Sequence, residues 1–120
     1  MKEDNIIQKK SYEFAVAIVK LTRWLSQEKK EYVLSKQLLR SGTSIGANIE
    51  EAIGGQSRKD FHAKLTIAYK ETRETHFWLR LLQDAEVMEQ KISKKYLLDC
   101  EELLKILTSI LKTLKSTHNS

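Results

Sequence analysis

Hydrophobic residues recur every three or four positions along most of the chain, which is the spacing of one face of an α-helix. Polar junctions near residues 28, 55 and 90 divide this pattern and predict helices over about 5–27, 31–54, 58–87 and 93–115. No stretch alternates with the period of two that a half-buried strand needs. The expected core rows are Ile7, Phe14, Ile18, Leu21 and Leu25; Leu34, Leu38, Ile45, Ile49 and Ala52; Phe61, Leu65, Ala68, Thr72, Thr75, Leu79 and Leu82; and Tyr96, Cys100, Leu103, Leu104, Leu107, Ile110, Leu111 and Leu114.

Short junctions place successive helices side by side, so the pattern predicts an all-α, antiparallel up-down four-helix bundle. One domain is expected to span residues 1–120. Ser57 followed by Asp60 resembles a capping box at the start of the third helix, and Ser93 can cap the fourth. A long coiled-coil hairpin is the main competing arrangement, and the polar breaks favour the bundle.

Two helices carry a second apolar row besides the expected core row. A wide core face and self-association both account for such rows, because exposed apolar patches of this size tend to be covered by another chain. The residues that would form an oligomer or partner interface are Tyr12, Val16 and Val19 in the first helix and Ile67, Phe77, Trp78 and Leu81 in the third.

Charge adds a candidate surface. The 120 residues include 21 Lys and Arg against 16 Asp and Glu, and the excess lies in residues 1–30 and 91–120. The first and last helices of an up-down bundle are neighbours, so their cations could share one basic surface that binds a phosphate backbone. An ordinary solvated face is the competing interpretation. The candidate nucleic-acid-binding residues are Lys9, Lys20, Arg23, Lys94, Lys105 and Lys112.

Composition bears on the compartment and the class of fold. The absence of proline and the presence of only four glycines favour long helices. A single cysteine, Cys100, excludes an internal disulfide framework and fits a reducing compartment. The first ten residues are charged and lack an apolar signal segment, so we expect a soluble cytoplasmic protein.

Residues that could carry enzyme chemistry are sparse. His62, His76 and His118 lack the Glu-x-x-His spacing of di-iron bundles, so neither a metal site nor another cofactor is expected. Cys100 falls in an apolar row, where a buried thiol is typical of a core. The sequence therefore predicts a protein that is not an enzyme.

A polar row borders the expected core of the second helix. We interpret it, together with a carboxylate of the third helix, as a structural hydrogen-bond network, and a catalytic carboxylate pair is the minority interpretation. The residues of this network are Ser44, Asn48, Glu51 and Glu74.

Residues 40–52, which read RSGTSIGANIEEA, resemble the signature of the 23S rRNA intervening-sequence proteins, also called four helix bundle proteins. A second matching stretch follows the third helix of that family, and the resemblance covers roughly residues 9–115. It comprises Ser57-Arg58-Lys59-Asp60-Phe61, Lys64-Leu65, Ile67-Ala68, Glu71, Glu74-Thr75 and Trp78-Leu79.

This resemblance implies a four-helix bundle assembled into a ring-like homopentamer, with no established enzymatic activity. Some genes of the family lie inside insertions in 23S rRNA genes. A related protein, the accessory variability determinant of diversity-generating retroelements, is a basic pentamer that binds nucleic acid and a reverse transcriptase, and it offers a precedent for the basic surface.

The function expected from the sequence is that of a homo-oligomeric bundle that binds RNA or DNA through backbone electrostatics. A protein-interaction scaffold that uses the apolar row of the third helix is the alternative. Hydrolase or nuclease chemistry at Glu51, Glu71 or Glu74 has the least support, because no nucleophile or metal set accompanies these carboxylates.

Overall fold

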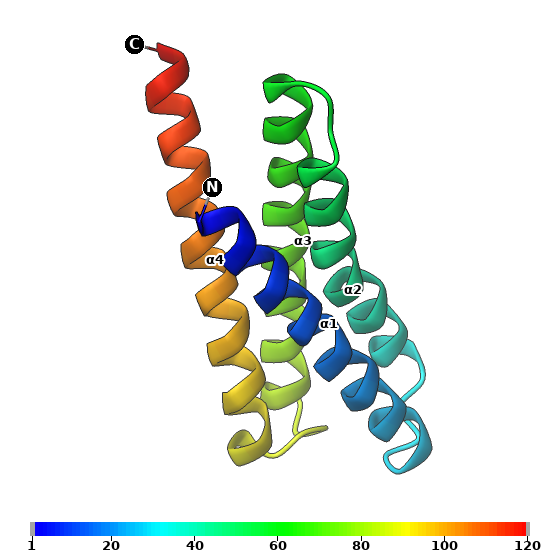
Figure 1. The fold of residues 1–120 in the computed structure, drawn as a ribbon. Helices are drawn as coiled ribbons and strands as arrows, with labels where there is room; N and C mark the ends of the chain where they lie inside the picture. Colours follow the sequence, from blue (N-terminus) through cyan, green and yellow to red (C-terminus); the bar gives the residue numbers. More distant parts are fainter. Residues whose placement is uncertain (1, 120) are drawn as a thin grey trace.

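The computed structural model describes residues 2–119, and the side chains of residues 5–116. It contains α1 (Lys2–Gln27), α2 (Val33–Ile53), α3 (Arg58–Asp84) and α4 (Gln90–Asn119), and no strand occurs in this part of the chain. Successive helices run in opposite directions in a rod of 50 × 21 × 21 Å (Figure 1). The predicted all-α, four-helix fold is therefore confirmed. His118 lies outside the described side chains.

The start of α2 is set by the preceding turn. Lys30 has a left-handed φ of 56°, which a helix does not continue through. The Glu31 carboxylate accepts hydrogen bonds from the Leu34 backbone N–H at 2.7 and 3.0 Å, so it satisfies a donor in the first turn. α2 consequently begins at Val33, two residues later than the pattern indicated.

The third helix begins with a side-chain cap and ends at a backbone turn. The Ser57 hydroxyl accepts a hydrogen bond from the Asp60 backbone N–H at 3.0 Å. At the other end Glu86 has a φ of 61°, so the chain leaves the helix before Val87. α3 therefore ends at Asp84, three residues short of the expected boundary.

The fourth helix begins at Gln90, so Ser93 lies in its first turn and does not precede it. The Ser93 side chain is fully buried, and its hydroxyl donates to the Gln90 carbonyl at 3.2 Å and to the Gln83 side chain. It links the start of α4 to the end of α3.

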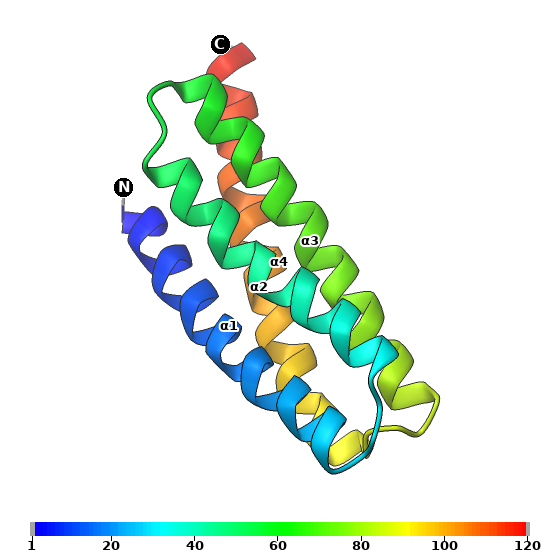
Figure 2. The same ribbon diagram turned by 90° about the vertical axis from the view of Figure 1, so that its right-hand side faces the viewer.

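Each helix lies beside two neighbours, and among the described residues the backbones of the diagonal pairs α1–α3 and α2–α4 do not approach closely. The α1–α4 edge has far fewer contacts than the other three edges. α4 also extends past the start of α1 in both views (Figures 1 and 2). Leu111 and Leu114 of this overhanging part are only partly buried. None of the described helices combines the length and the apolarity that a membrane span requires.

The core follows the predicted rows closely. All five residues of the first row are at most 4% exposed, and the central residues of the other three rows are equally buried except Leu104, which is half-buried. Residues at the ends of those rows, such as Leu34 and Phe61, are half-buried because the helix ends have fewer neighbours. The predicted apolar rows of the four helices therefore form one hydrophobic core.

Two glycines of α2 lie directly against α1. A Cβ atom added at Gly42 would lie 2.8 Å from Cγ2 and 3.3 Å from Cβ of Ile18. One turn later, a Cβ at Gly46 would lie 3.3 Å from the Ser11 carbonyl oxygen. The two glycines therefore let α1 pack directly on the backbone of α2.

On the side of α2 that faces α3, small hydroxyl side chains occupy buried positions where apolar side chains would be expected. The Thr75 hydroxyl of α3 donates to the Ser41 hydroxyl at 2.9 Å, and both side chains are fully buried. Thr75 also lies 2.8 Å from the Glu71 carbonyl, so the pair leaves no hydroxyl without a partner. This contact fixes the register of α2 against α3.

Replacing Gly42 by alanine should lower the free energy of unfolding by roughly 1 kcal/mol. Overpacking against Ile18 costs about 1–3 kcal/mol, while removing a helical glycine returns about 1 kcal/mol. Urea unfolding followed by circular dichroism measures the difference. Gly54→Ala is the matched control, because Gly54 has φ −81° and its added Cβ would lie 3.5 Å from the Glu50 carbonyl oxygen. A Gly42→Ala variant as stable as the wild type would contradict this packing.

Candidate functional site

Several charged residues of α3 contact a particular neighbouring helix. Glu71 and Glu74 point toward α2, where both contact Arg40. His76 points toward α4, where its Nε2 lies 2.8 Å from a carboxylate oxygen of Glu101. α3 thus directs two of its carboxylates toward α2 and His76 toward α4.

The side of α3 that faces α4 is basic. Arg73 and Arg80 lie three residues before and four residues after His76, so they share its face of the helix. Both arginines are exposed. Each guanidinium lies near an aromatic ring of α3, with Arg73 6.0 Å from the Tyr69 centroid and Arg80 5.9 Å from the Phe77 centroid.

A matching row of lysines follows α4. Lys94 and Lys105 lie seven residues before and four residues after Glu101, and Lys112 follows seven residues later on the same exposed face. Because Glu101 contacts His76, the two rows border the same helix–helix junction. The α3–α4 basic face is defined here by Arg73, Arg80, Lys94, Lys105 and Lys112.

The positive charges of the α3–α4 basic face are not neutralised by ion pairs with the described side chains. None of its five cations forms an ion pair with any side chain that the structure describes. The one carboxylate between the two rows, Glu101, is already bound to His76. Clustered positive charge without internal partners attracts anionic polymers.

The other half of the expected basic surface lies on the outer side of α1. Lys9, Lys20 and Arg23 are exposed there, and Tyr12 and Val16 share that side at 65% and 39% exposure. The cationic row and the second apolar row of α1 therefore form one mixed face. We refer to Lys9, Lys20 and Arg23 as the α1 row.

The structure places Lys94, Lys105 and Lys112 beside α3, whereas Lys20 of the α1 row lines a hollow shared with Ile92 and Tyr96 of α4. A groove of about 290 Å³ runs along the α1–α4 edge, and three carboxylates line it beside two ammonium groups. Lys10 of α1 is paired with Glu102 of α4 at 3.2 Å, so part of this charge is neutralised in the groove. The expected continuous α1–α4 surface is divided because α4 is rotated to present its lysines beside α3. The groove is lined by Lys10, Glu13, Phe14, Ala17, Lys95, Asp99, Glu102 and Leu103.

The expected polar network is distributed over three separate contacts. Asn48 donates to the Ser44 carbonyl within α2 at 2.8 Å, and the Ser44 hydroxyl donates to the Arg40 carbonyl at 2.7 Å. Glu51 forms an ion pair with Lys64 of α3 at 3.5 Å. Glu74 belongs to a different group of contacts, because it binds the side chain of Arg40, which lies one turn of α2 before Ser44.

Arg40 is the centre of that group, the α2–α3 cluster, which comprises Arg40, Glu71, Glu74 and Trp78. Its guanidinium donates to both Glu71 oxygens, at 3.2 and 3.3 Å, and to Glu74. The Trp78 indole N–H donates to the Glu74 carboxylate at 2.9 Å. The hydrogen bond from Trp78, followed by the one from Arg40, lowers the pKa of Glu74, although partial burial opposes the shift. The two carboxylates raise the pKa of Arg40.

The second apolar row of α3 lies beside the α2–α3 cluster. Ile67 and Leu81 are 41% and 37% exposed, and Trp78 is half-buried between them. Phe77 packs edge-on against Trp78, with 5.1 Å between ring centroids and 73° between ring planes. Val19 of α1 is half-buried and lies on another helix that does not touch α3, so the two rows form two distinct faces.

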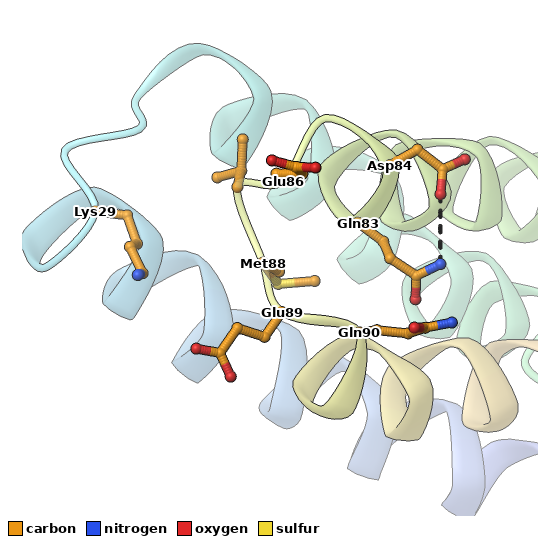
Figure 3. Close-up of a pocket in the computed structure, with 8 residues that line it drawn as sticks. Lys29, Gln83, Asp84, Glu86, Met88, Glu89 and Gln90 are labelled. Atoms are coloured by element: carbon orange, nitrogen blue, oxygen red, sulfur yellow. Dashed lines mark hydrogen bonds between the residues drawn. The ribbon is translucent and has the colours of Figure 1, made fainter.

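A polar hollow at one end of the bundle has no charged side chains directed toward a common point (Figure 3). It holds about 560 Å³ between Lys29 and the α3–α4 turn, and Figure 3 shows the carboxylates of Asp84 and Glu89 pointing away from each other. Across the described residues, no three His, Cys, Asp or Glu side chains are placed to hold a metal ion. Burial raises the pKa of Cys100 to about 12, which keeps this core thiol protonated.

The fold defines a small all-α four-helix bundle. The chain matches the model of the family described as 23S rRNA-intervening sequence protein over residues 3–109, and it belongs to this family. It is similar to a Bacteroides thetaiotaomicron protein of unknown function from the S23 ribosomal protein family, whose crystal structure was determined at 1.70 Å resolution. That similarity has a TM-score of 0.90 and 52% identity over 92% of this chain and 98% of the other. None of the curated proteins matches the chain.

Arg73 and Arg80 are the surface residues that the sequence interpretation missed. Counting charge by segment hid them, because residues 57–90 contain equal numbers of cations and carboxylates. The spacing of seven residues between the two arginines, offset from Glu71 and Glu74, was the available signal. Helical projection of the charged residues would have placed Arg73 and Arg80 on one side of α3, away from Glu71 and Glu74.

The α2–α3 cluster predicts an acid transition below the ordinary glutamate pKa of about 4.3. Because Trp78 and Arg40 hold Glu74 ionised, its contribution to stability is present above its unfolded pKa and is lost as the pH falls through the lowered folded pKa. Trp78 fluorescence, measured in a Trp24→Phe background, should change across that range. Glu74→Gln should abolish the transition, and a midpoint at or above the ordinary value would refute the assignment.

Proposed function

We propose that this protein is a non-enzymatic homo-oligomer that binds nucleic acid through the α3–α4 basic face. The observation that carries the proposal is the meeting of two rows of unpaired cations along one helix junction. The phosphate backbone dominates the affinity of such contacts, and arginine forms bidentate hydrogen bonds with phosphate. RNA is the first probe, because the family is described by an rRNA-intervening sequence.

The α3–α4 basic face is preferred to the α1 row for two reasons. It contributes five cations from two adjacent helices, whereas the α1 row contributes three from one helix and lies beside the carboxylates of the α1–α4 groove. Each of its arginines also lies about 6 Å from the centroid of an aromatic ring of α3, which limits the conformational freedom that binding would remove. The α1 row remains a second, smaller candidate contact.

Neutralising two contacts on the α3–α4 basic face should weaken RNA binding and reduce its salt dependence. Each lost phosphate contact lowers the slope of log K against log salt by about 0.7–0.9, so Arg73→Gln with Lys105→Gln should reduce it by roughly 1.5. Fluorescence anisotropy across a salt series measures both quantities. Lys20→Gln with Arg23→Gln is the matched double variant on α1, and its effect should be smaller.

Two outcomes would contradict this assignment. Absence of salt-sensitive binding by the wild-type protein would remove the nucleic-acid function. An equal or larger loss in the α1 variant would move the interface to the α1 row.

The exposed row of α3 supports a second function, a protein-interaction scaffold whose first partner is another copy of the chain. Ile67 and Leu81 expose apolar surface beside the half-buried Trp78. A separate apolar face on α1 carries Tyr12 and Val16, and two unlike faces on one protomer suit head-to-tail contacts that close into a ring. Five subunits is the number that the family resemblance implies.

Ile67→Lys with Leu81→Lys should reduce the assembly toward the 14.0 kDa protomer, because each change places a charge inside the proposed contact. Light scattering after size-exclusion chromatography measures the mass. Val33→Lys is the control, since Val33 is 73% exposed at the start of α2 and lies off this row. A wild-type protein of protomer mass would exclude self-association and leave the row for a different protein partner.

A further inference from the structure

An exposed aromatic ring lies within the cations of α3. Phe77 is 46% exposed, and Arg73 and Arg80 lie four residues before it and three residues after it. The Arg80 guanidinium carbon lies 5.9 Å from its ring centroid. An apolar ring of this size in a strongly charged neighbourhood is not explained by the core, which lies on the opposite side of α3.

The ring is held in a defined orientation. Its T-shaped contact with Trp78 fixes one side, and Trp78 is in turn held by its hydrogen bond to Glu74. The Arg40 guanidinium anchors Glu74 from α2. A preorganised aromatic surface loses little conformational entropy when a flat ligand stacks on it.

Base stacking is the chemistry that such a ring offers within a phosphate-binding face. Bases stack on aromatic side chains and on arginine planes without sequence preference, because every base has a π-face. Inside a duplex both faces of a base are covered by its neighbours. The ring is therefore accessible only to a base that is unpaired and unstacked.

We propose that the α3–α4 basic face binds single-stranded nucleic acid in preference to duplex, with a base stacked on Phe77 and neighbouring phosphates bound by Arg73 and Arg80. The two arginines are seven residues apart, roughly 10 Å along the helix, so they flank the ring on both sides. This inference rests on the proposed nucleic-acid function and adds the class of strand. RNA and DNA share the phosphate and the base face, so single strands of both are expected to bind.

The test compares an unstructured single-stranded oligonucleotide with the duplex formed from it and its complement, both fluorescein-labelled and titrated at the same salt concentration. Wild-type protein should bind the single strand more tightly. Phe77→Leu should weaken single-strand binding by roughly 5- to 100-fold, the range for losing one stacked base, and should leave duplex binding unchanged. Phe77→Tyr should retain the wild-type preference, since it keeps the ring.

The controls separate stacking from folding, assembly and charge. Tyr12→Leu removes a 65% exposed aromatic ring from α1 and should leave the binding of both probes unchanged. Light scattering should give Phe77→Leu the wild-type mass. A loss of binding that accompanies a changed mass and is not rescued by Phe77→Tyr would overturn the inference.

The remaining outcomes distinguish the stacking inference from the proposed nucleic-acid function on which it rests. Equal binding of both probes by Phe77→Leu and by the wild type, with both weakened in Arg73→Gln Lys105→Gln, would overturn stacking and leave the electrostatic function intact. Absence of binding of either probe to the wild type would overturn both proposals.

Discussion

The close approach of α1 to α2 is the constraint on which the rest of the bundle depends. Gly42 and Gly46 remove the side chains that would hold the helices apart, and Ile18 fills the space that Gly42 leaves. α1 therefore packs mainly on α2 and makes few contacts with α4. The α1–α4 edge keeps a groove lined by carboxylates and by one lysine of each helix, while Lys94, Lys105 and Lys112 lie beside α3.

The family signature in residues 40–52 is explained largely by packing. Gly42 and Gly46 face α1, while Ser41 forms a buried hydroxyl contact with Thr75 of α3. Arg40 extends from the start of this segment to the acidic side of α3, where it binds two carboxylates. The segment therefore positions α1 on one side and α3 on the other. The small side chains and Arg40 of this segment all serve the packing of α2 against its neighbours. The signature therefore does not by itself define a ligand.

For the proposed function, the important result of this packing is where the charged side chains of α3 lie. Arg40 holds the carboxylates of Glu71 and Glu74 toward α2, and Trp78 adds a hydrogen bond to Glu74. Arg73 and Arg80 are left on the opposite side, next to the lysines of α4. α3 thus contributes two arginines to a cationic surface. Phe77 lies between the basic side and the apolar row, so the proposed nucleic-acid contact and the proposed self-association meet at one residue.

The sequence alone determined the four helices and their buried rows, because the period of 3.6 residues places each apolar residue on a known side of its own helix. It also indicated the exposed rows of α1 and α3, and the cations of α1 and α4. The tertiary structure decided which rows become neighbours. Periodicity defines angles within one helix, but the rotation and register between two helices come from packing, such as the contact of His76 with Glu101. That rotation joined the lysines of α4 to Arg73 and Arg80, and it divided the expected polar network among separate contacts.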